Sequence, residues 1–309
     1  MTKNMIENYV KKLIENMPSS SSGKPEVIDL ILDGGIFNGS YQIGCLYFLR
    51  EMENQKRVQI DKISACSVGA ICGILYHIKK LELSIKIYDS ILKYFKKHKK
   101  LEILHSFIDN NIRLLLPLDI HKQLSNKLHI CYYDVKKQKK VIRKKYKSID
   151  DLLNVVKRSS FVPFLINGNL AYENKYIDGI NAHILKQVLN KKILYIDLLG
   201  YDKLFYALSI KNEKSNFHRI LSGVLDIHLF FIKTTSTQMC SYVNKWSLLE
   251  WSKNKLLKYF IEKCALYFMA LYIGLKRYIP EELKNSLITK VFQKAIQELS
   301  VITIDHFCL

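Results

Sequence analysis

Ser67 is the residue of this sequence that is best placed to act as a nucleophile. It lies between a short strand-like run, 61–66, and an apolar run that is typical of a helix. Its neighbours two positions away, Ala65 and Gly69, are small. A sharp strand-to-helix turn requires this, because larger side chains would collide where the backbone folds back. The pattern predicts an exposed serine hydroxyl, and a serine that only caps the helix is the other interpretation.

A glycine loop earlier in the chain has the composition of an anion site. The apolar run 27–32 is followed at once by Asp33-Gly-Gly-Ile-Phe-Asn-Gly39 and then by a helical pattern. Adjacent glycines let amide N–H groups point at a negative charge, and the start of a helix adds a partial positive charge. The spacing fits neither the dinucleotide fingerprint nor a P-loop. An oxyanion or phosphate site of another type is the interpretation that stays open.

An aspartate far downstream supplies a candidate base. Asp178 directly precedes Gly179 at the end of a strand-like run, so its carboxylate is expected on a tight turn. Such an Asp-Gly pair is also common in ordinary turns. A serine hydroxyl is a poor nucleophile at neutral pH, and a carboxylate within hydrogen-bonding reach can accept its proton.

In this order the three motifs resemble those of the patatin-like phospholipase family, over about residues 26–200. That family carries D-G-G-G-x-R/K-G, then G-x-S-x-G, then D-G-G/A. This sequence has Asp33 to Gly39, Ala65 to Gly69 and Asp178 to Ile180 at these places. The segment 158–163 also looks like the family's run of small residues that ends in proline. The lysine-rich composition and this form of the loop are similar to members encoded by large DNA viruses.

The resemblance implies a lipid acyl hydrolase that needs neither a metal nor an organic cofactor. Ser67 would be the nucleophile and Asp178 the general base. The backbone amides of Gly34, Gly35 and Ile36 would form the oxyanion hole. The substrates would be phospholipids or related lipids, cleaved as by an A-type phospholipase or a lysophospholipase. The residues that support the motifs are Asp33, Gly39, Ala65, Gly69 and Gly179.

Four positions differ from the family pattern. Ile36 replaces the third glycine of the first motif, and Asn38 replaces its basic residue. Ala65 replaces the first glycine of the second motif, G-x-S-x-G, which forms the sharp turn at Ser67. Ile180 replaces the last small residue of the third motif. A β-branched side chain at position 36 restricts the loop, and Asn38 removes a charge from it. The alternative function is therefore a catalytically weak or inactive adaptor at a membrane surface.

A second enzymatic alternative is an α/β-hydrolase with a Ser-Asp-His triad. Asp197 and either His218 or His228 follow Ser67 in the chain order that this triad needs. That interpretation leaves the glycine loop and the Asp178 turn without a role.

Composition narrows the choice of partners. The chain has 309 residues, a hydrophobic share of 49% and a formal charge of +20. Lysines spread along the whole chain favour a solvated surface and peripheral contact with an anionic membrane. A nucleic-acid groove, by contrast, would cluster arginine with aromatic residues. Seven cysteines without a C-x-x-C pair indicate reduced core residues rather than a zinc site. With no secretory signal or spanning run evident, we expect a cytoplasmic protein, in the host cytoplasm if it is viral.

The elements that must position these residues alternate between strand and helix patterns from 27 to 199. This alternation predicts an α/β, patatin-like three-layer fold with a largely parallel central sheet flanked by helices. We expect three parts. They are an N-terminal helix and linker at 1–24, the hydrolase domain at 25–215, and a mostly helical C-terminal region at 216–309. The sequence does not predict the oligomeric state.

Overall fold

The computed structural model describes residues 2–18, 24–189, 191–198, 210–260, 262–264 and 266–267. Most of the predicted linker and the part of the C-terminal region after 267 therefore lie outside the described residues. The predicted boundary between 215 and 216 stays a prediction, although the central sheet continues beyond it.

A mixed seven-stranded sheet forms the centre of the described part of the chain. Its order is β4-β3-β2-β1-β6-β7, and β5 pairs with β3. The four central strands are parallel, and the antiparallel strands lie toward the edges. This confirms the predicted largely parallel sheet. The parallel strands are β1 (Glu26–Leu32), β2 (Val58–Cys66), β3 (Leu128–Asp134) and β6 (Lys192–Ile196). The antiparallel strands are β4 (Lys139–Arg143), β5 (Tyr176–Asp178) and β7 (Cys240–Tyr242).

Two strands share one edge of β3, and this arrangement sets the position of the site. On β3, Cys131 pairs with Cys66 of β2, and the next residue, Tyr132, pairs with Asp178 of β5. Strand β2 runs parallel to β3, whereas β5 runs antiparallel to it. The C-terminal ends of β2 and β5 therefore meet, so Ser67 and Asp178 are brought together.

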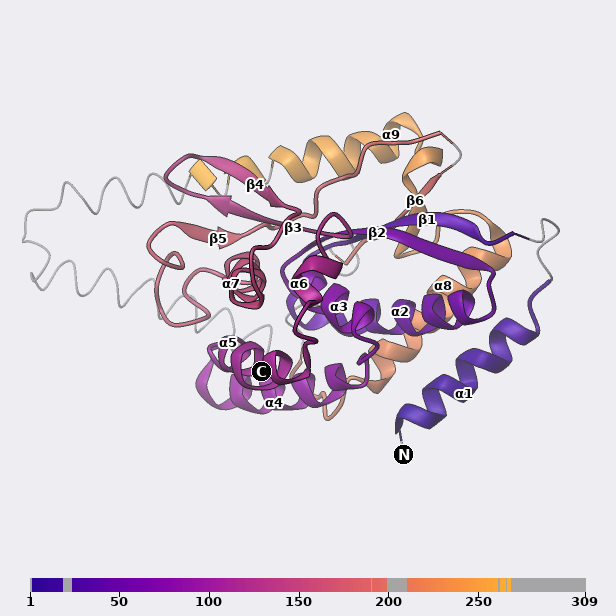
Figure 1. Cartoon of the computed structure of the whole chain (residues 1–309), viewed down its shortest axis with the longest axis horizontal. Coiled ribbons are helices and arrows are strands. Elements are labelled where there is room, and N and C mark those ends of the chain that lie inside the picture. Colours follow the sequence, from indigo (N-terminus) through magenta and orange to yellow (C-terminus); the bar gives the residue numbers. More distant parts are fainter. Residues whose placement is uncertain are drawn as a thin grey trace, which may run out of the picture.

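Helices cover both faces of the sheet, as predicted for three layers. In Figure 1, α2, α3 and α8 lie on one side of the sheet, and the helical segment that starts at α9 lies on the other. The α-helices are α1 (Thr2–Glu15), α2 (Gly39–Asn54), α3 (Val68–His77), α4 (Leu83–His98), α5 (Ile103–Phe107), α6 (Ile120–Gln123), α7 (Ile149–Ser159), α8 (Phe217–Lys233) and α9 (Leu248–Trp251). Shorter or wider helical turns are η1 (Ile36–Asn38), η2 (Ile108–Ile112), η3 (Arg113–Leu115), η5 (Val243–Lys245) and η6 (Ser252–Leu257).

Glycines allow α8 to pack closely on α2. A Cβ atom at Gly44 would lie 2.0 Å from the carbonyl oxygen of Ile220, and one at Gly223 would lie 2.0 Å from that of Tyr41. Where α2 and α8 cross, each helix therefore contacts the other through a glycine that has no side chain. This contact fixes α8, which the sequence predicted only as part of a C-terminal helical region, directly onto the helix that follows the glycine loop.

The core consists of the apolar side chains between the sheet and these helices, including Leu30, Phe48 and Ile74. The buried free cysteines of the described residues are Cys45, Cys66, Cys72, Cys131 and Cys240. Among the helices that the structure describes, none combines the length and the apolar character that crossing a bilayer requires.

Candidate active site

Ser67 lies in the sharp turn between β2 and α3. Its backbone has φ 52° and ψ −131°, a sparsely populated conformation for a residue with a side chain. A Cβ atom at Gly69 would approach the carbonyl oxygen of Leu32 to 2.5 Å, which explains why this position must be small. The N–H of Ser67 donates to Oγ of Ser159 at 2.9 Å. The structure therefore places Ser67 in the sharp strand-to-helix turn that the small residues Ala65 and Gly69 predicted.

The Asp178 carboxylate meets Ser67 at the end of β5. Its Oδ1 accepts from the N–H of Ile180 at 2.7 Å, and the Ser67 side chain lies close enough to lower the pKa of the carboxyl. Burial raises the pKa of Asp178 to about 6, against the opposing effects of the Ser67 side chain and the Ile180 N–H. A Cβ atom at Gly179 would lie 2.6 Å from the carbonyl oxygen of Cys131, so the turn is held against β3. A carboxyl group with this pKa is able to take a proton near neutral pH.

The glycine loop lies against both groups. A Cβ atom at Gly34 would lie 3.0 Å from Cβ of Ser67 and 3.0 Å from the carbonyl oxygen of Ile180. Among the described residues, none accepts a hydrogen bond from the N–H of Gly34, Gly35 or Ile36. Within the described part of the chain, these amides are left to donate to a ligand atom beside the serine.

The two isoleucines that replace small residues of the family motifs both lie in the left-handed region. Ile36 has φ 46° and Ile180 has φ 59°. For an L-residue this region costs roughly 1–2 kcal/mol, and glycine adopts it freely. The loop and the turn thus have a backbone that suits glycine although isoleucine occupies both positions. The restriction predicted at Ile36 is present as backbone strain.

Replacing Ile180 with glycine should relieve this strain at the third motif. We expect Ile180→Gly to raise the free energy of unfolding by about 0.5–1 kcal/mol, because the relief exceeds the added flexibility of the unfolded chain. Urea denaturation measures this change. Ile184→Gly is the matched control, since Ile184 is equally half-buried but does not have positive φ. That control should lower stability, and a loss of stability in both variants would contradict the strain argument.

The charge that Asn38 removes from the loop is supplied by α8. Nη1 of Arg219 donates to Oδ1 of Asn38 at 2.6 Å, and Nδ2 of Asn38 donates to the carbonyl oxygen of Leu198 at 3.0 Å. Arg219 is buried and pairs with Glu213 at 2.6 Å. A guanidinium group therefore lies beside the loop even though the loop has no basic residue of its own. Sequence order alone did not indicate this residue, which is 181 positions from Asn38.

The structure does not assemble the alternative triad. Nε2 of His218 lies 3.1 Å from Glu213, and the ring of His228 packs against Phe48. Asp197 pairs with Lys258 at 2.9 Å rather than with a histidine. The side chain that lies beside Ser67 is instead that of Asp178, whose pKa Ser67 lowers.

Several residues of the site were not predicted from the sequence. Oγ of Ser159 both accepts from Ser67 and donates to the carbonyl oxygen of Cys131 at 2.7 Å, so it ties the turn at Ser67 to β3. Tyr195 and Lys258 both donate to the buried carboxylate of Asp33. The run of small residues at 158–163 was the available signal for Ser159. No motif pointed to the other two, which are distant in sequence.

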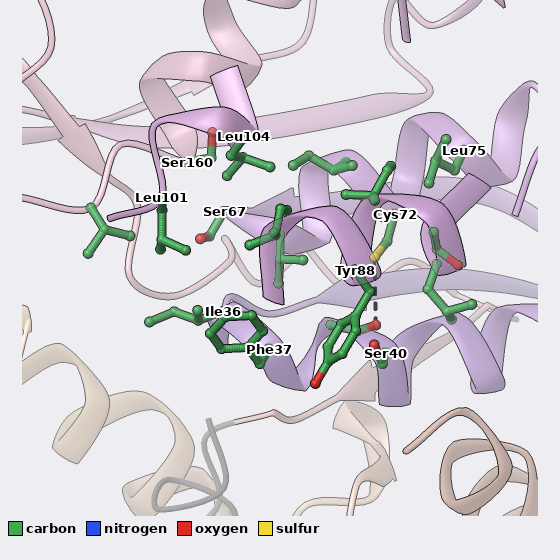
Figure 2. A pocket seen from close by; sticks show the side chains of 18 residues that line it. Ile36, Phe37, Ser40, Ser67, Cys72, Leu75, Tyr88, Leu101, Leu104 and Ser160 are labelled. Carbon is green, nitrogen blue, oxygen red and sulfur yellow. Dashed lines mark hydrogen bonds between the residues drawn. The ribbon is translucent and has the colours of Figure 1, made fainter. Parts of the chain in front are cut away.

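An apolar cavity opens at Ser67 and extends along α3. Figure 2 shows Ser67 near Leu101 and Leu104 at one end and Leu75 toward the other. Leu75 lies eight positions after Ser67, which is about 12 Å along the helix axis. Other lining residues are Ile36, Phe37, Ile43, Val68, Ile71, Cys72, Ile87, Tyr88, Ile91 and Val162. The walls are therefore suited to a flexible hydrocarbon chain whose end lies at the serine.

One family model matches the part of the chain that holds the glycine loop and Ser67. Residues 30–119 match the family model described as patatin-like phospholipase. Among solved structures, the chain is similar to VipD from Legionella pneumophila, with 15% sequence identity and a TM-score of 0.31. That similarity covers 59% of this chain and 55% of the VipD chain, so the chain spans little more than half of it. No curated protein matches this chain. The matched residues 30–119, which include the glycine loop and Ser67, are thus similar to patatin-like phospholipases.

Proposed function

We propose that this protein is a lipid acyl hydrolase that cleaves carboxylic esters of phospholipids or related lipids. The observation that carries the proposal is that Ser67 lies beside Asp178 and lines one end of an apolar cavity. An acyl chain in this cavity brings its ester carbonyl to the serine hydroxyl. The family match supports a lipid substrate.

The chemistry proceeds in two steps on this geometry. Asp178 accepts the Ser67 proton as Oγ attacks the carbonyl carbon, and the N–H groups at Gly34, Gly35 and Ile36 stabilise the oxyanion. The protonated carboxyl then gives its proton to the departing alcohol oxygen, which leaves an acyl-serine. Asp178 next takes a proton from water, whose oxygen attacks the acyl carbon. It gives this proton to Oγ as the bond between the acyl carbon and Oγ breaks, which releases the fatty acid and restores the Ser67 hydroxyl. No step needs a metal ion or an organic cofactor.

The cavity should set the length of the acyl chain that is cleaved. We expect Leu75→Phe to fill the end far from Ser67 and to lower kcat/KM for long-chain esters by about tenfold. Short-chain esters, which do not reach Leu75, should be cleaved as by the parent. Release of p-nitrophenol from a series of esters of increasing chain length measures both rates. An equal loss for butyrate and palmitate would show that the chain does not lie along α3.

We further propose that the protein meets its substrate at an anionic membrane surface. The C-terminal helical segment comprises residues 248–260, 262–264 and 266–267. It exposes Leu248 and Leu249, which are 90% and 80% accessible, together with Phe260. Exposed lysines such as Lys255 lie in the same segment. Apolar side chains next to lysines on a helix are typical of segments that lie in the lipid interface. The net charge of +20 adds attraction to anionic headgroups.

Vesicle sedimentation tests this surface. Binding should be stronger to phosphatidylcholine vesicles that contain phosphatidylserine than to pure phosphatidylcholine. Replacing Leu248 and Leu249 together with glutamine should weaken binding by at least about tenfold, because two inserted leucines are lost. The matched control replaces Leu114 and Leu118, which are 81% and 90% accessible elsewhere on the surface. If the control pair weakens binding and the 248/249 pair does not, this surface is wrong.

A further inference from the structure

Two charged side chains four positions apart, the half-buried Lys258 and the buried Glu262, project from the C-terminal helical segment toward the site. Lys258 and Glu262 have the i, i+4 spacing that places both on one helix face. Nζ of Lys258 donates to Oδ2 of Asp33 at 2.9 Å, to Oδ1 of Asp197 at 2.9 Å and to the hydroxyl of Tyr195 at 2.6 Å. Burial lowers the pKa of Lys258, but Asp33 and Asp197 raise it more, so this side chain stays protonated.

Asp33, one of the hydrogen-bond partners of Lys258, links the first and third motifs. Asp33 begins the glycine loop, and its Oδ1 accepts from the N–H of Ala182 at 2.8 Å. Its own carbonyl oxygen accepts from the side chain of Gln42 at 2.7 Å. The Asp33 carboxylate thus links the loop beside Ser67 to the segment that follows the Asp178 turn. Lys258 neutralises the charge at this junction.

Glu262 contacts residues next to the Asp178 turn. Its carboxylate accepts from Nζ of Lys140 at 2.7 Å, from Nδ2 of Asn181 at 3.3 Å and from the hydroxyl of Tyr133. Nζ of Lys140 also donates to the carbonyl oxygen of Asn181 at 2.8 Å. The residue after Ile180 is therefore fixed between a strand of the sheet and the C-terminal helix.

We infer that Lys258 and Glu262 are positioning residues that hold the glycine loop and the Asp178 turn in place against Ser67. This inference rests on the proposed function, because it concerns how the hydrolytic site is assembled. The helix would thereby complete a site whose reacting groups all lie more than 70 residues earlier in the chain. Neither side chain touches the reacting atoms.

The charges around Asp178 provide a readout that a purely structural role would not change. Asp33 raises the pKa of Asp178, and Lys140 lowers it. The other groups that face this carboxylate are the Ser67 hydroxyl, the N–H of Ile180 and the thiol of Cys66, whose pKa burial raises well above its usual value. Lys258 balances the charge of Asp33, and Glu262 balances that of Lys140. Removing the two helix charges should therefore shift the pKa of Asp178 in opposite directions.

The experiment compares the pH dependence of kcat/KM, and of the rate of fluorophosphonate labelling, for the whole 309-residue chain and its variants. In Lys258→Met the midpoint of the acidic limb should rise by about half a pH unit, and in Glu262→Gln it should fall by a similar amount. Lys258→Arg keeps the charge and should keep the parental midpoint. Lys253→Met, which removes an exposed lysine from the same segment, is the matched control and should also keep it.

The outcomes separate this inference from the proposed function. If labelling requires Ser67 but the midpoints of Lys258→Met and Glu262→Gln coincide with the parental midpoint, the positioning inference is wrong and the hydrolase proposal stands. Shifts of both variants in the same direction would also overturn it. If Lys258→Met does not fold, Glu262→Gln decides the question, because its amide keeps the shape of the carboxylate. A parent chain that is not labelled at any pH overturns both proposals.

Discussion

Replacing Ser67 with alanine should reduce ester hydrolysis by at least about 10⁴-fold, since it removes the atom that attacks the carbonyl carbon. The fold should be unaffected, because alanine keeps the Cβ atom and the N–H that donates to Ser159. Labelling of the parent by a fluorophosphonate, followed by denaturing electrophoresis, tests the same residue without a lipid substrate. The parent should be labelled, and Ser67→Ala should not.

A surface serine provides the control for this experiment. Ser222 is exposed on α8, and its hydroxyl donates to the carbonyl oxygen of His218. Ser222→Ala should be labelled and should hydrolyse esters at the parental rate. An unlabelled parent that still binds anionic vesicles would favour the inactive membrane-surface adaptor, for which the strained Ile36 in the oxyanion loop would be the structural reason.

Asp178→Asn should lower kcat by about 10³–10⁴-fold and at the same time stabilise the protein. The amide cannot accept the Ser67 proton, although its oxygen can still accept from the N–H of Ile180. Burial raises the pKa of this carboxyl from 3.8 to about 6, so ionising it costs more in the folded state than in the unfolded state. At neutral pH the cost amounts to up to about 3 kcal/mol, which the asparagine variant avoids.

The direction of the pH dependence follows from the same raised pKa. Between about pH 4 and pH 6 the folded parent binds more protons than the unfolded chain, so its stability falls as pH rises through this window. Activity changes in the opposite direction, because the base must be ionised, and kcat/KM should decline below about pH 6. The stability of Asp178→Asn should lack this decrease. Urea midpoints and initial rates measured across this range check both statements.

Equal stability of Asp178→Asn and the parent at pH 4 and at pH 7 would contradict the raised pKa. An unchanged rate would contradict the role of Asp178 as the base. His218→Ala and His228→Ala complete the comparison, because the triad alternative needs one of these histidines. Their contacts to Glu213 and Phe48 lead us to expect no loss of activity from either change.

The sequence was sufficient to identify the elements that carry the motifs. Apolar runs before Asp33 and Ser67 predicted strands, and the small residue at position 69 predicted the sharp turn. These features depend on local sterics and on the period of apolar residues, which are encoded within a few positions. The largely parallel sheet followed from the alternation of strand and helix patterns, and the structure confirms it.

Strain at the loop was only partly predictable. The sequence shows that Ile36 and Ile180 stand where the family has small residues, but not which backbone conformation they adopt. The surrounding packing holds both in the left-handed region at a local cost. Likewise, the sequence shows that Asn38 removes a positive charge from the loop. Only the packing of α8 on α2 reveals that Arg219 lies beside Asn38 and supplies that charge. Such compensation depends on the approach of distant helices and leaves no local pattern.

What the sequence determined by itself is therefore the identity of the candidate groups and the local shape of their turns. Only the tertiary structure decided that they meet. Because β2 and β5 occupy the same edge of β3 in opposite directions, their C-terminal ends abut, and Asp178 reaches Ser67 across 111 positions of sequence. The same holds for Lys258, which reaches Asp33 from 225 positions away. Long-range contacts of this kind arise from strand register and helix packing, which no single segment specifies.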